Sequence, residues 1–407
     1  MSSNEIVTVL DLGSTKVSCM AASSESNGDV KIRALATTPC KGMKRGVLAD
    51  LEETARSIDV VVRRVQQDLD QEIGSVVVGV SGAHIEGINA RGLKPIVPRS
   101  RLITHQDVME VINHSRSLVL PPDREQIQAL PREFRIDGQR DVQKPIGMSG
   151  GKLEVVTYIV TGQTSAVQNL EKAVASAGKR VEQMVLSPLA AGIGVLTDEE
   201  MDLGAAIVDI GGGKTDIAVF ANGSIAYSAS IPVGAQYVTS DISKLIKTSP
   251  EEAERLKTSF GSAMAKLVGE NDSVQVMQLG QGQARPMQRR VLSEIIESRM
   301  RELAVMVKQH LQKSGFDAIL PGGVVLTGGG SQLTDVDKLF ADVLKHLRIR
   351  VAEPELPSQF PRESGMASLV GLARFALQCQ DDVTPANGAP VWRDRVRSLF
   401  SMISGKT

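Results

Sequence analysis

The chain has 407 residues, of which 42% are hydrophobic, so it is long enough to bury a large core and to form two or more domains. Its formal net charge of −1 excludes a global field that would recruit nucleic acid, so any basic partner surface must be local. Three scattered cysteines, without the spacing of a disulfide or zinc framework, fit a reducing cytoplasm. The sequence has no signal-peptide pattern and no apolar run of transmembrane length, and its five histidines show no metal-ligand spacing.

The first predicted element is a β-hairpin over Ile6–Val17. An apolar strand leads to Asp11, a glycine turn with two hydroxyl residues follows, and apolar residues then resume. The backbone N–H groups of such a turn can form a concave nest for an anion. The turn residues that we expect near a phosphate are Gly13, Ser14, Thr15 and Lys16.

A basic stretch and a helix follow this hairpin. We favour a solvated loop for Lys41–Arg45 over a phosphate or lipid contact. From Leu51 to Leu69 apolar residues recur at helical spacing, which predicts a core-facing helix that ends before Gly74. Residues 75–82 then form a candidate for a buried strand.

Residues 84–163 differ in character from what precedes them. Arginine and proline are more frequent, and the order of strand, helix and strand is self-contained. Thr104 and Asp107 form a near capping box, which predicts a helix start with Val108 and Val111 on the buried face. We interpret this segment as a small inserted domain.

The second glycine hairpin, over Ala205–Phe220, repeats the plan of the first. A P-loop is excluded, because that motif needs a glycine at position 208, where valine stands, and because the exit segment alternates like a strand. Asp209 and Asp216 flank the turn and would repel a phosphate unless a cation such as Mg²⁺ intervened. The turn residues that we expect near a phosphate are Gly211, Gly212, Gly213, Lys214 and Thr215.

One such hairpin could equally be a ligand-free glycine turn. Two copies about half a chain apart instead favour two similar α/β halves that face each other across a nucleotide cleft. Gly234 is placed to admit a phosphate, and a third glycine cluster could let an adenosine approach the backbone. That cluster follows the apolar run Val324–Leu326 and comprises Gly328, Gly329, Gly330 and Ser331.

The last part of the chain predicts a membrane anchor. Residues 378–390 are polar and lack periodicity, which indicates a flexible linker, and residues 391–407 follow as an amphipathic helix. Arginines beside its apolar stripe favour a membrane surface over docking on the core. The residues concerned are Trp392, Arg393, Arg395, Val396, Arg397, Leu399, Phe400 and Ile403. One tail binds weakly, so a row of tails on a polymer would couple assembly to membrane attachment.

The three glycine motifs, in this order, resemble the phosphate-1, phosphate-2 and adenosine motifs of the actin, heat-shock chaperone and sugar-kinase ATPase superfamily. Within it, the chain is similar to the FtsA family of bacterial cell-division proteins. The stretches that carry this likeness run collinearly through most of the chain: Lys41–Val47, Val80–His84, Pro145–Gly150, Val208–Gly213, Thr239–Ile242, Ala253–Lys257 and Val325–Gly329.

The resemblance implies an α/β, actin-like ATPase fold of two similar halves around a nucleotide cleft, with an inserted small α/β domain and a C-terminal amphipathic helix. We expect residues 1–83 and 164–197 to form the first half and residues 84–163 the insertion. Residues 198–377 would form the second half, with an outer subdomain at about 230–310. The linker and the membrane helix would follow, over 378–390 and 391–407.

The resemblance also implies ATP and Mg²⁺ as cofactors. Asp11 and Asp209 would hold the metal through water, with Asp209 positioning metal and water for chemistry. Glu254 and Lys257, which by themselves read as a surface ion pair on one helical face, would contact ribose and adenine. Hydrolysis would be slow at most, because Ser187 and Pro188 stand where active relatives carry Gln or Glu.

The partners implied are the acidic C-terminal peptide of FtsZ, with Arg299 as its anchor, further copies of the chain in filaments, and other division proteins at the inserted domain. The expected function is to polymerise at the division site, on the cytoplasmic face of the inner membrane, and to anchor the FtsZ ring to anionic lipid there; nucleic acid is not an expected partner. One alternative is a pilus-assembly scaffold like PilM. The other is a sugar-kinase-type phosphotransferase, which would need a carboxylate base in the cleft.

Overall fold

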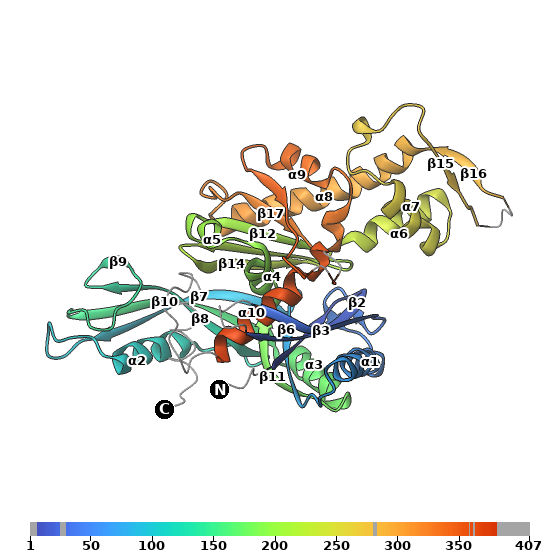
Figure 1. The fold of residues 1–407 in the computed structure, drawn as a ribbon. Coiled ribbons are helices and arrows are strands. Elements are labelled where there is room, and N and C mark those ends of the chain that lie inside the picture. Colours follow the sequence, from blue (N-terminus) through green and yellow to red (C-terminus); the bar gives the residue numbers. More distant parts are fainter. Residues whose placement is uncertain (1–5, 25–29, 280–282, 358, 361–362, 381–407) are drawn as a thin grey trace.

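The computed structural model describes residues 6–24, 30–279, 283–357, 359–360 and 363–380. Two large sheets lie one above the other in Figure 1, and two smaller units extend to opposite sides of them, one containing α2 and the other α7. The predicted membrane helix, and the linker beyond Gln380, lie outside the described residues.

The described residues up to Leu203 form one sheet with its helices, the first small unit and a short last helix that contacts the second sheet. The leading elements are β1 (Ile6–Leu12), β2 (Lys16–Ser24), β3 (Val30–Pro39), β4 (Met43–Lys44), β5 (Val47–Leu48), α1 (Leu51–Leu69) and β6 (Ser75–Val80). The small unit comprises β7 (Ile85–Pro95), α2 (His105–Arg116), β8 (Arg124–Ile136), β9 (Gln139–Val142) and β10 (Lys152–Gln163). The chain then returns as α3 (Thr164–Ser176), β11 (Arg180–Leu186), α4 (Ser187–Val195) and α5 (Asp198–Leu203).

The remaining elements form the second sheet and the second small unit. They begin with β12 (Ala205–Ile210), β13 (Thr215–Ala221), β14 (Ser224–Ile231), α6 (Ala235–Ile246), α7 (Pro250–Phe260) and the short 3₁₀ helix η1 (Ala265–Leu267). They continue with β15 (Ser273–Val276), β16 (Arg285–Gln288), α8 (Arg289–Ser314), β17 (Val324–Thr327), η2 (Gly329–Gln332), α9 (Val336–Leu344), β18 (Ile349–Val351), η3 (Ser364–Met366) and α10 (Ala367–Gln380).

The two large sheets share one topology. The first has the order β3-β2-β1-β6-β11 and the second the order β14-β13-β12-β17-β18. In each, three antiparallel strands in sequence are continued by two strands parallel to the first of them. The strands read as near-continuous apolar runs because helices cover both faces of each sheet. The predicted pair of similar α/β halves is therefore confirmed.

Two helices rich in small residues join the halves. The helix α10 packs on β1, β2 and β6 of the first sheet, while α4 packs on β12 and β13 of the second. The helices touch at backbone distance, since a Cβ added to Gly371 would lie 1.7 Å from the Ala190 carbonyl oxygen. A Cβ added to Gly194 would lie 2.3 Å from the Ala367 carbonyl oxygen. Small residues are thus what allows this central contact.

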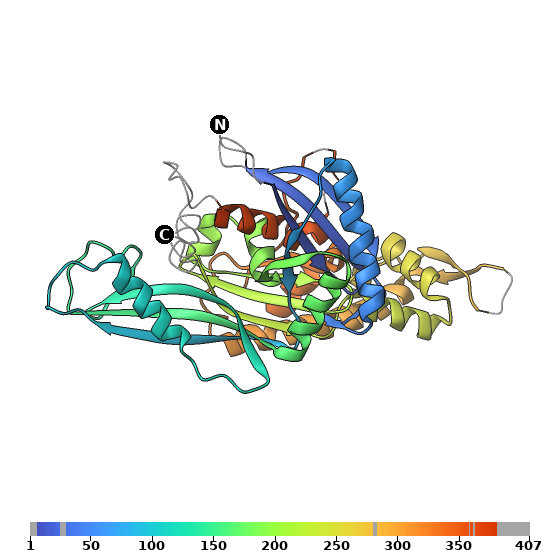
Figure 2. The same cartoon turned by 90° about the horizontal axis from the view of Figure 1, so that it is seen from below.

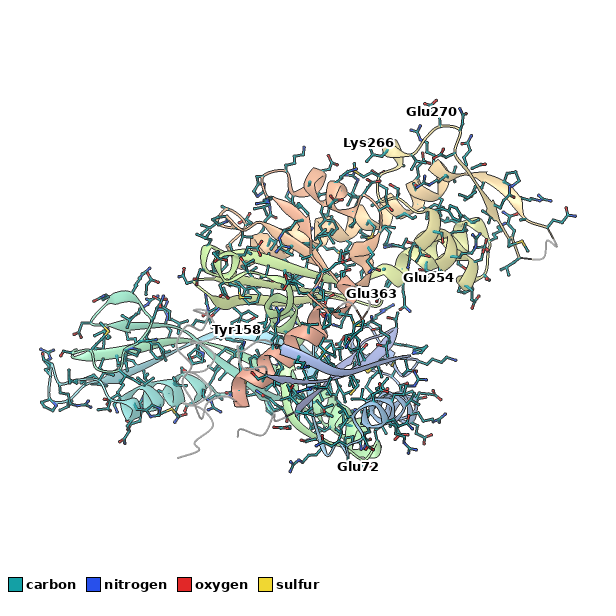
Figure 3. The ribbon with its side chains drawn as sticks, in the orientation of Figure 1. Glu72, Tyr158, Glu254, Lys266, Glu270 and Glu363 are labelled. Atoms are coloured by element: carbon teal, nitrogen blue, oxygen red, sulfur yellow. The ribbon has the colours of Figure 1, made fainter. Side chains whose placement is uncertain are left out.

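The inserted segment folds around its own core. Its antiparallel sheet has the order β7-β10-β8-β9, and α2 covers one face. The predicted capping box is present, with Thr104 and Asp107 each bonding the other's backbone N–H. The unit also contacts the second half, because the Tyr158 hydroxyl bonds Ser228 Oγ at 2.8 Å at the inner end of the unit (Figure 3). Figure 2 shows it projecting on the side opposite to the outer unit of α6, α7, β15 and β16.

The structure matches one predicted boundary and departs from another. The helix α1 ends at Leu69, the last residue of the predicted apolar stripe, because Asp70 adopts a left-handed conformation and its N–H bonds the carbonyls of Gln66 and Gln67. The helix α10 continues through Gln380, so the first three residues of the predicted linker are helical. No helix in the described ranges is long and apolar enough to span a membrane.

Candidate functional site

The two glycine hairpins face each other between the halves. Each turn is closed by an equivalent backbone bond, Gly13 N to Lys16 O and Gly211 N to Lys214 O, both 2.9 Å. The turns are also in direct contact, since a Cβ at Gly212 would come within 2.4 Å of Thr15 Cγ2. A Cβ at Gly213 would come within 2.6 Å of Ser14 Oγ. The structure therefore places both predicted turns at one site.

Carboxylates gather behind the two turns. Asp209 faces Asp216 across the second hairpin, and Asp216 is 2% exposed. Asp209 Oδ2 accepts a hydrogen bond of 2.9 Å from Ser368 Oγ at the start of α10. The Lys214 ammonium bonds both Asp216 Oδ2 and Ser81 Oγ. Asp216 Oδ1 is buried and has no hydrogen-bond partner among the described residues.

Burial sets the electrostatics of these groups. It raises the pKa of Asp209 to about 6, and the neighbouring Asp216 adds to the rise while Lys214 opposes it. Burial likewise raises the pKa of Asp11, against the opposing charges of Lys214 and Lys16. Each carboxylate is therefore poorly compensated by the protein alone, and a cation at this point would favour its ionised form.

The residues fit a polyphosphate with its metal on these grounds. Two glycine-rich turns meet at one point, and two under-compensated carboxylates lie behind them. Within the described residues, no cluster of three or more His, Cys, Asp or Glu side chains is arranged to hold a metal directly. A metal contact through water from Asp11 and Asp209 stays a prediction.

The third glycine cluster supports the second hairpin. Gly328 has φ of 84°, and a Cβ there would lie 2.2 Å from Asp209 Oδ1. Gly330 packs on the Ile210 side chain, and the buried Ser331 hydroxyl donates to the Gly328 carbonyl at 2.8 Å. Gly329 differs from both, because nothing lies within 4 Å of its added Cβ. Of the four residues predicted to meet an adenosine, Gly329 is the one with open space beside its backbone.

Gly234, predicted to admit a phosphate, lies against the second hairpin turn. A Cβ there would lie 2.5 Å from the carbonyl oxygens of both Gly211 and Gly212. The first amides of α6 are used by the same turn, with Ala235 N bonding Gly211 O at 2.9 Å and Gln236 N bonding Gly212 O at 2.8 Å. Glycine is needed here so that the start of α6 can hold the turn by its backbone.

Glu254 and Lys257 form an ion pair that reaches the start of α6. Lys257 Nζ lies 2.7 Å from Glu254 Oε2 and 2.9 Å from Thr239 Oγ1. It also lies 3.4 Å from the carbonyl oxygen of Ala235, the residue that holds the turn. The Lys257 side chain is only 11% exposed, so this is not an ordinary surface pair. Glu254 lies on the side of the outer unit that faces the first half (Figure 3).

The basic stretch Lys41–Arg45 is not simply a solvated loop. Lys41, Lys44 and Arg45 are exposed, but the adjoining Gly46 is buried at the site, and its N–H donates to Ser14 Oγ at 3.3 Å. The Arg45 guanidinium lies 5.4 Å from the ring centre of Tyr237 on α6. The loop thus touches both hairpin turns and the second half. Sequence reasoning missed this, although the two glycines that bracket Met43–Arg45 were a signal for close backbone approach.

Arg299 lies on α8 and is already paired. Its guanidinium donates to Asp241 Oδ2 at 2.7 Å, bonds Glu302, and lies 5.8 Å from the Tyr237 ring centre. An acidic partner at Arg299 would compete with these two carboxylates. Ser187 and Pro188 are buried at the start of α4 and provide no carboxylate to the site. The eight predicted membrane-contacting residues, from Trp392 to Ile403, lie outside the described residues.

Family models match two parts of the chain. One, described as cell division protein FtsA, matches residues 206–371, and the other, an SHS2 domain inserted in FtsA, matches residues 82–161. The cell division protein FtsA of Pseudomonas aeruginosa is 34% identical over 93% of this chain and 91% of its own length. The cell division protein FtsA of Neisseria meningitidis serogroup B is 34% identical over 98% of this chain and 96% of its own length. The FtsA of Bacillus subtilis is 32% identical over 93% of this chain and 85% of its own length.

Solved structures show the same architecture at low sequence identity. A chain of the PilM–PilN type IV pilus biogenesis complex has a TM-score of 0.63 at 16% identity, covering 92% of this chain and 99% of its own. MreB5 of Spiroplasma citri bound to ADP has a TM-score of 0.56 at 16% identity, covering 91% and 96%. These likenesses show an actin-like fold.

Proposed function

The chain belongs to the FtsA family of cell-division proteins, and from this premise we propose that it is an ATP-binding, actin-like scaffold. It polymerises on the cytoplasmic face of the membrane at the division site, anchors the FtsZ ring there and helps to recruit later division proteins. The observation that carries the nucleotide part is the pair of equivalent glycine turns in contact between the halves, with Asp11 and Asp209 behind them.

The residues that would hold ATP with Mg²⁺ lie in both halves. The turns Gly13–Lys16 and Gly211–Thr215 would bind phosphate oxygens, while Asp11 and Asp209 would orient the hydrated metal. Bound Mg²⁺–ATP would supply positive charge to the carboxylates and anionic oxygens to the turn amides. Because its groups come from both halves, such a site favours their closed arrangement. Hydrolysis is slow in this proposal, since Ser187 and Pro188 offer no general base.

The nucleotide proposal is tested by titration calorimetry with Mg²⁺–ATP. Asp209→Ala removes a carboxylate of the site, and we expect the affinity to fall by about tenfold or more. Asp59→Ala is the matched control, because Asp59 lies on α1 and its pair with Arg63 is exposed. Equal ATP affinity in all three proteins would refute the assignment of the site.

The membrane and FtsZ parts rest on the C-terminal sequence and on the family. The apolar stripe and flanking arginines of residues 391–403 support an anionic lipid surface as the partner. The partly exposed ion pairs of Arg299 on α8 support exchange with an acidic peptide such as the FtsZ C-terminus. Arg299 is only partly exposed, so its release from Asp241 and Glu302 limits the affinity.

Liposome co-sedimentation with ATP tests both parts. The full chain is compared with a chain ending at Gln380, the end of α10, in the presence of a labelled FtsZ C-terminal peptide. We expect only the full chain to sediment and to carry the peptide down. Arg299→Ala should release the peptide but not the protein, while Arg290→Ala on the same helix should release neither. Both chain lengths remaining in the supernatant would exclude the tail as an anchor.

A further inference from the structure

Lys214 crosses from the second hairpin turn into the first half. Its ammonium bonds Asp216 Oδ2 within its own hairpin and Ser81 Oγ just beyond β6 of the other half. The side chain is 14% exposed, and that of Asp216 is 3% exposed. Lys214 is a residue that the sequence predicts near a phosphate, and in the structure its ammonium faces a carboxylate of its own hairpin and a hydroxyl of the opposite half.

The first half is shaped to receive this side chain. A Cβ added to Gly46 would lie 2.7 Å from Lys214 Cδ and 3.0 Å from Lys214 Cε. Gly46 also has a φ of 79°, a backbone conformation that residues other than glycine rarely adopt. The aliphatic stem of Lys214 therefore passes through space that exists because residue 46 is glycine.

The charges around the Lys214 ammonium do not balance without it. Asp11, Asp209 and Asp216 all act on it electrostatically. Burial alone would lower the pKa of Lys214, but the attraction of these three carboxylates outweighs burial and raises it. The other nearby cation, Lys16, lies 3.8 Å from Glu363, which is outside this trio. His84, which lies beside Ser81, carries no compensating charge, because burial and Lys214 lower its pKa.

We propose that Lys214 is the resident cation of the site: it ties Asp216 to Ser81 across the two halves in the nucleotide-free protein and gives way when Mg²⁺ arrives with a nucleotide. This proposal rests on the proposed function for its second part, since a bound metal is what replaces the ammonium. Its first part, the tie, stands on the contacts of Lys214, Ser81 and Gly46 alone.

Exchange follows from the geometry of the turns. In this structure the two turns touch, so phosphate groups can enter only if the turns separate. Separation moves Lys214 away from Ser81, because the lysine belongs to one turn and the serine to the other half. The carboxylates then need another counter-charge, and a divalent cation supplies it. Lys214 thereby holds the two turns in contact and makes nucleotide entry dependent on the metal.

The experiment compares melting temperatures of the full-length protein with and without Mg²⁺–ATP. Lys214→Met keeps the stem and removes the charge, and we expect the nucleotide-free protein to melt about 5 °C lower or more, because Asp216 loses its buried partner. Lys172→Met is the matched control on the exposed face of α3 and should leave the melting temperature within about 1 °C. With saturating Mg²⁺–ATP, the gap between Lys214→Met and the wild type should close.

The outcomes separate the two proposals. A nucleotide-free Lys214→Met protein as stable as the control refutes the tie, and a gap that persists with Mg²⁺–ATP refutes the exchange. A wild type that shows no shift with Mg²⁺–ATP refutes the proposed nucleotide function, while the nucleotide-free comparison still decides the tie. If Lys214→Met does not fold, Ser81→Ala removes only the cross-half bond, and a melting temperature unchanged from the wild type would then refute the tie.

Discussion

The contact between α4 and α10 can be tested by adding a single methyl group. In Gly371→Ala the new Cβ would lie 1.7 Å from the Ala190 carbonyl oxygen and 2.5 Å from its carbon. Both atoms belong to helix backbone and cannot rotate away. To restore an ordinary separation of 3.4 Å, the two helices must move apart by roughly 1.7 Å.

The cost follows from what this movement disrupts. The two helices form the centre of a core cluster that reaches both sheets, so a gap between them loses dispersion contacts along their whole interface. Overpacking a core by one methyl group typically costs 1–3 kcal/mol, and the clash here is with backbone, so we expect about 3 kcal/mol or more. In urea, with a slope of roughly 3 kcal/mol/M, the unfolding midpoint should fall by about 1 M.

The matched control is Gly74→Ala, the same substitution where nothing lies within 4 Å of the added Cβ. It should leave the midpoint unchanged or raise it slightly. The assay is equilibrium urea unfolding followed by circular dichroism. A midpoint for Gly371→Ala within about 0.2 M of that for Gly74→Ala would show that the close helix contact is wrong. Because α10 joins the halves, the variant should also bind Mg²⁺–ATP more weakly than the control.

Two further predictions concern carboxylates of opposite behaviour. Arg101, whose nitrogens lie 2.6 and 2.7 Å from the Asp107 carboxylate oxygens, holds the pKa of Asp107 far below its usual range. This stabilisation is complete above the unfolded pKa of about 3.9 and declines as the pH falls below it towards the folded pKa. Asp107→Asn should therefore cost about 3 kcal/mol at pH 7 and less at pH 2, measured by hydrogen exchange of α2 amides. An equal cost at both values would contradict the ion pair. Burial raises the pKa of Asp209 to about 6, so the ionisation of Asp209 lowers the stability of the folded protein as the pH rises from 4 through 6. Asp209→Asn should therefore raise the melting temperature of the nucleotide-free protein at pH 8 but not at pH 4. A lower melting temperature of this variant at pH 8 would contradict the burial argument.

The sequence by itself determined the family, the repeated plan of the chain and the position of the insertion. The two hairpins could be found because apolar strands, an aspartate and a glycine turn are local patterns that recur with the same spacing. The capping box of Thr104 and Asp107 was found for the same reason. The likeness to the FtsA family, now confirmed by relatives over most of the chain, rests on the order of these local motifs.

Contacts between distant segments were beyond the sequence. A glycine in the sequence indicates that a larger side chain would clash there, but it does not indicate which segment of the chain that side chain would meet. Gly234 was expected to admit a phosphate and instead holds the turn at Gly211 and Gly212, while Gly46, in a stretch that seemed solvated, makes room for Lys214. The structural role of each glycine depends on its contact with a segment that is distant in the sequence.

Charged residues show the same limit. Lys214 stands in a turn that reads as phosphate-binding, yet its partners are Asp216, two residues away, and Ser81, which lies in the other half. Arg299 likewise reads as a free anchor and is held by Asp241 and Glu302. The partner of a long charged side chain is set by which carboxylates the fold brings within reach and by how deeply they are buried, and only the tertiary structure fixes both.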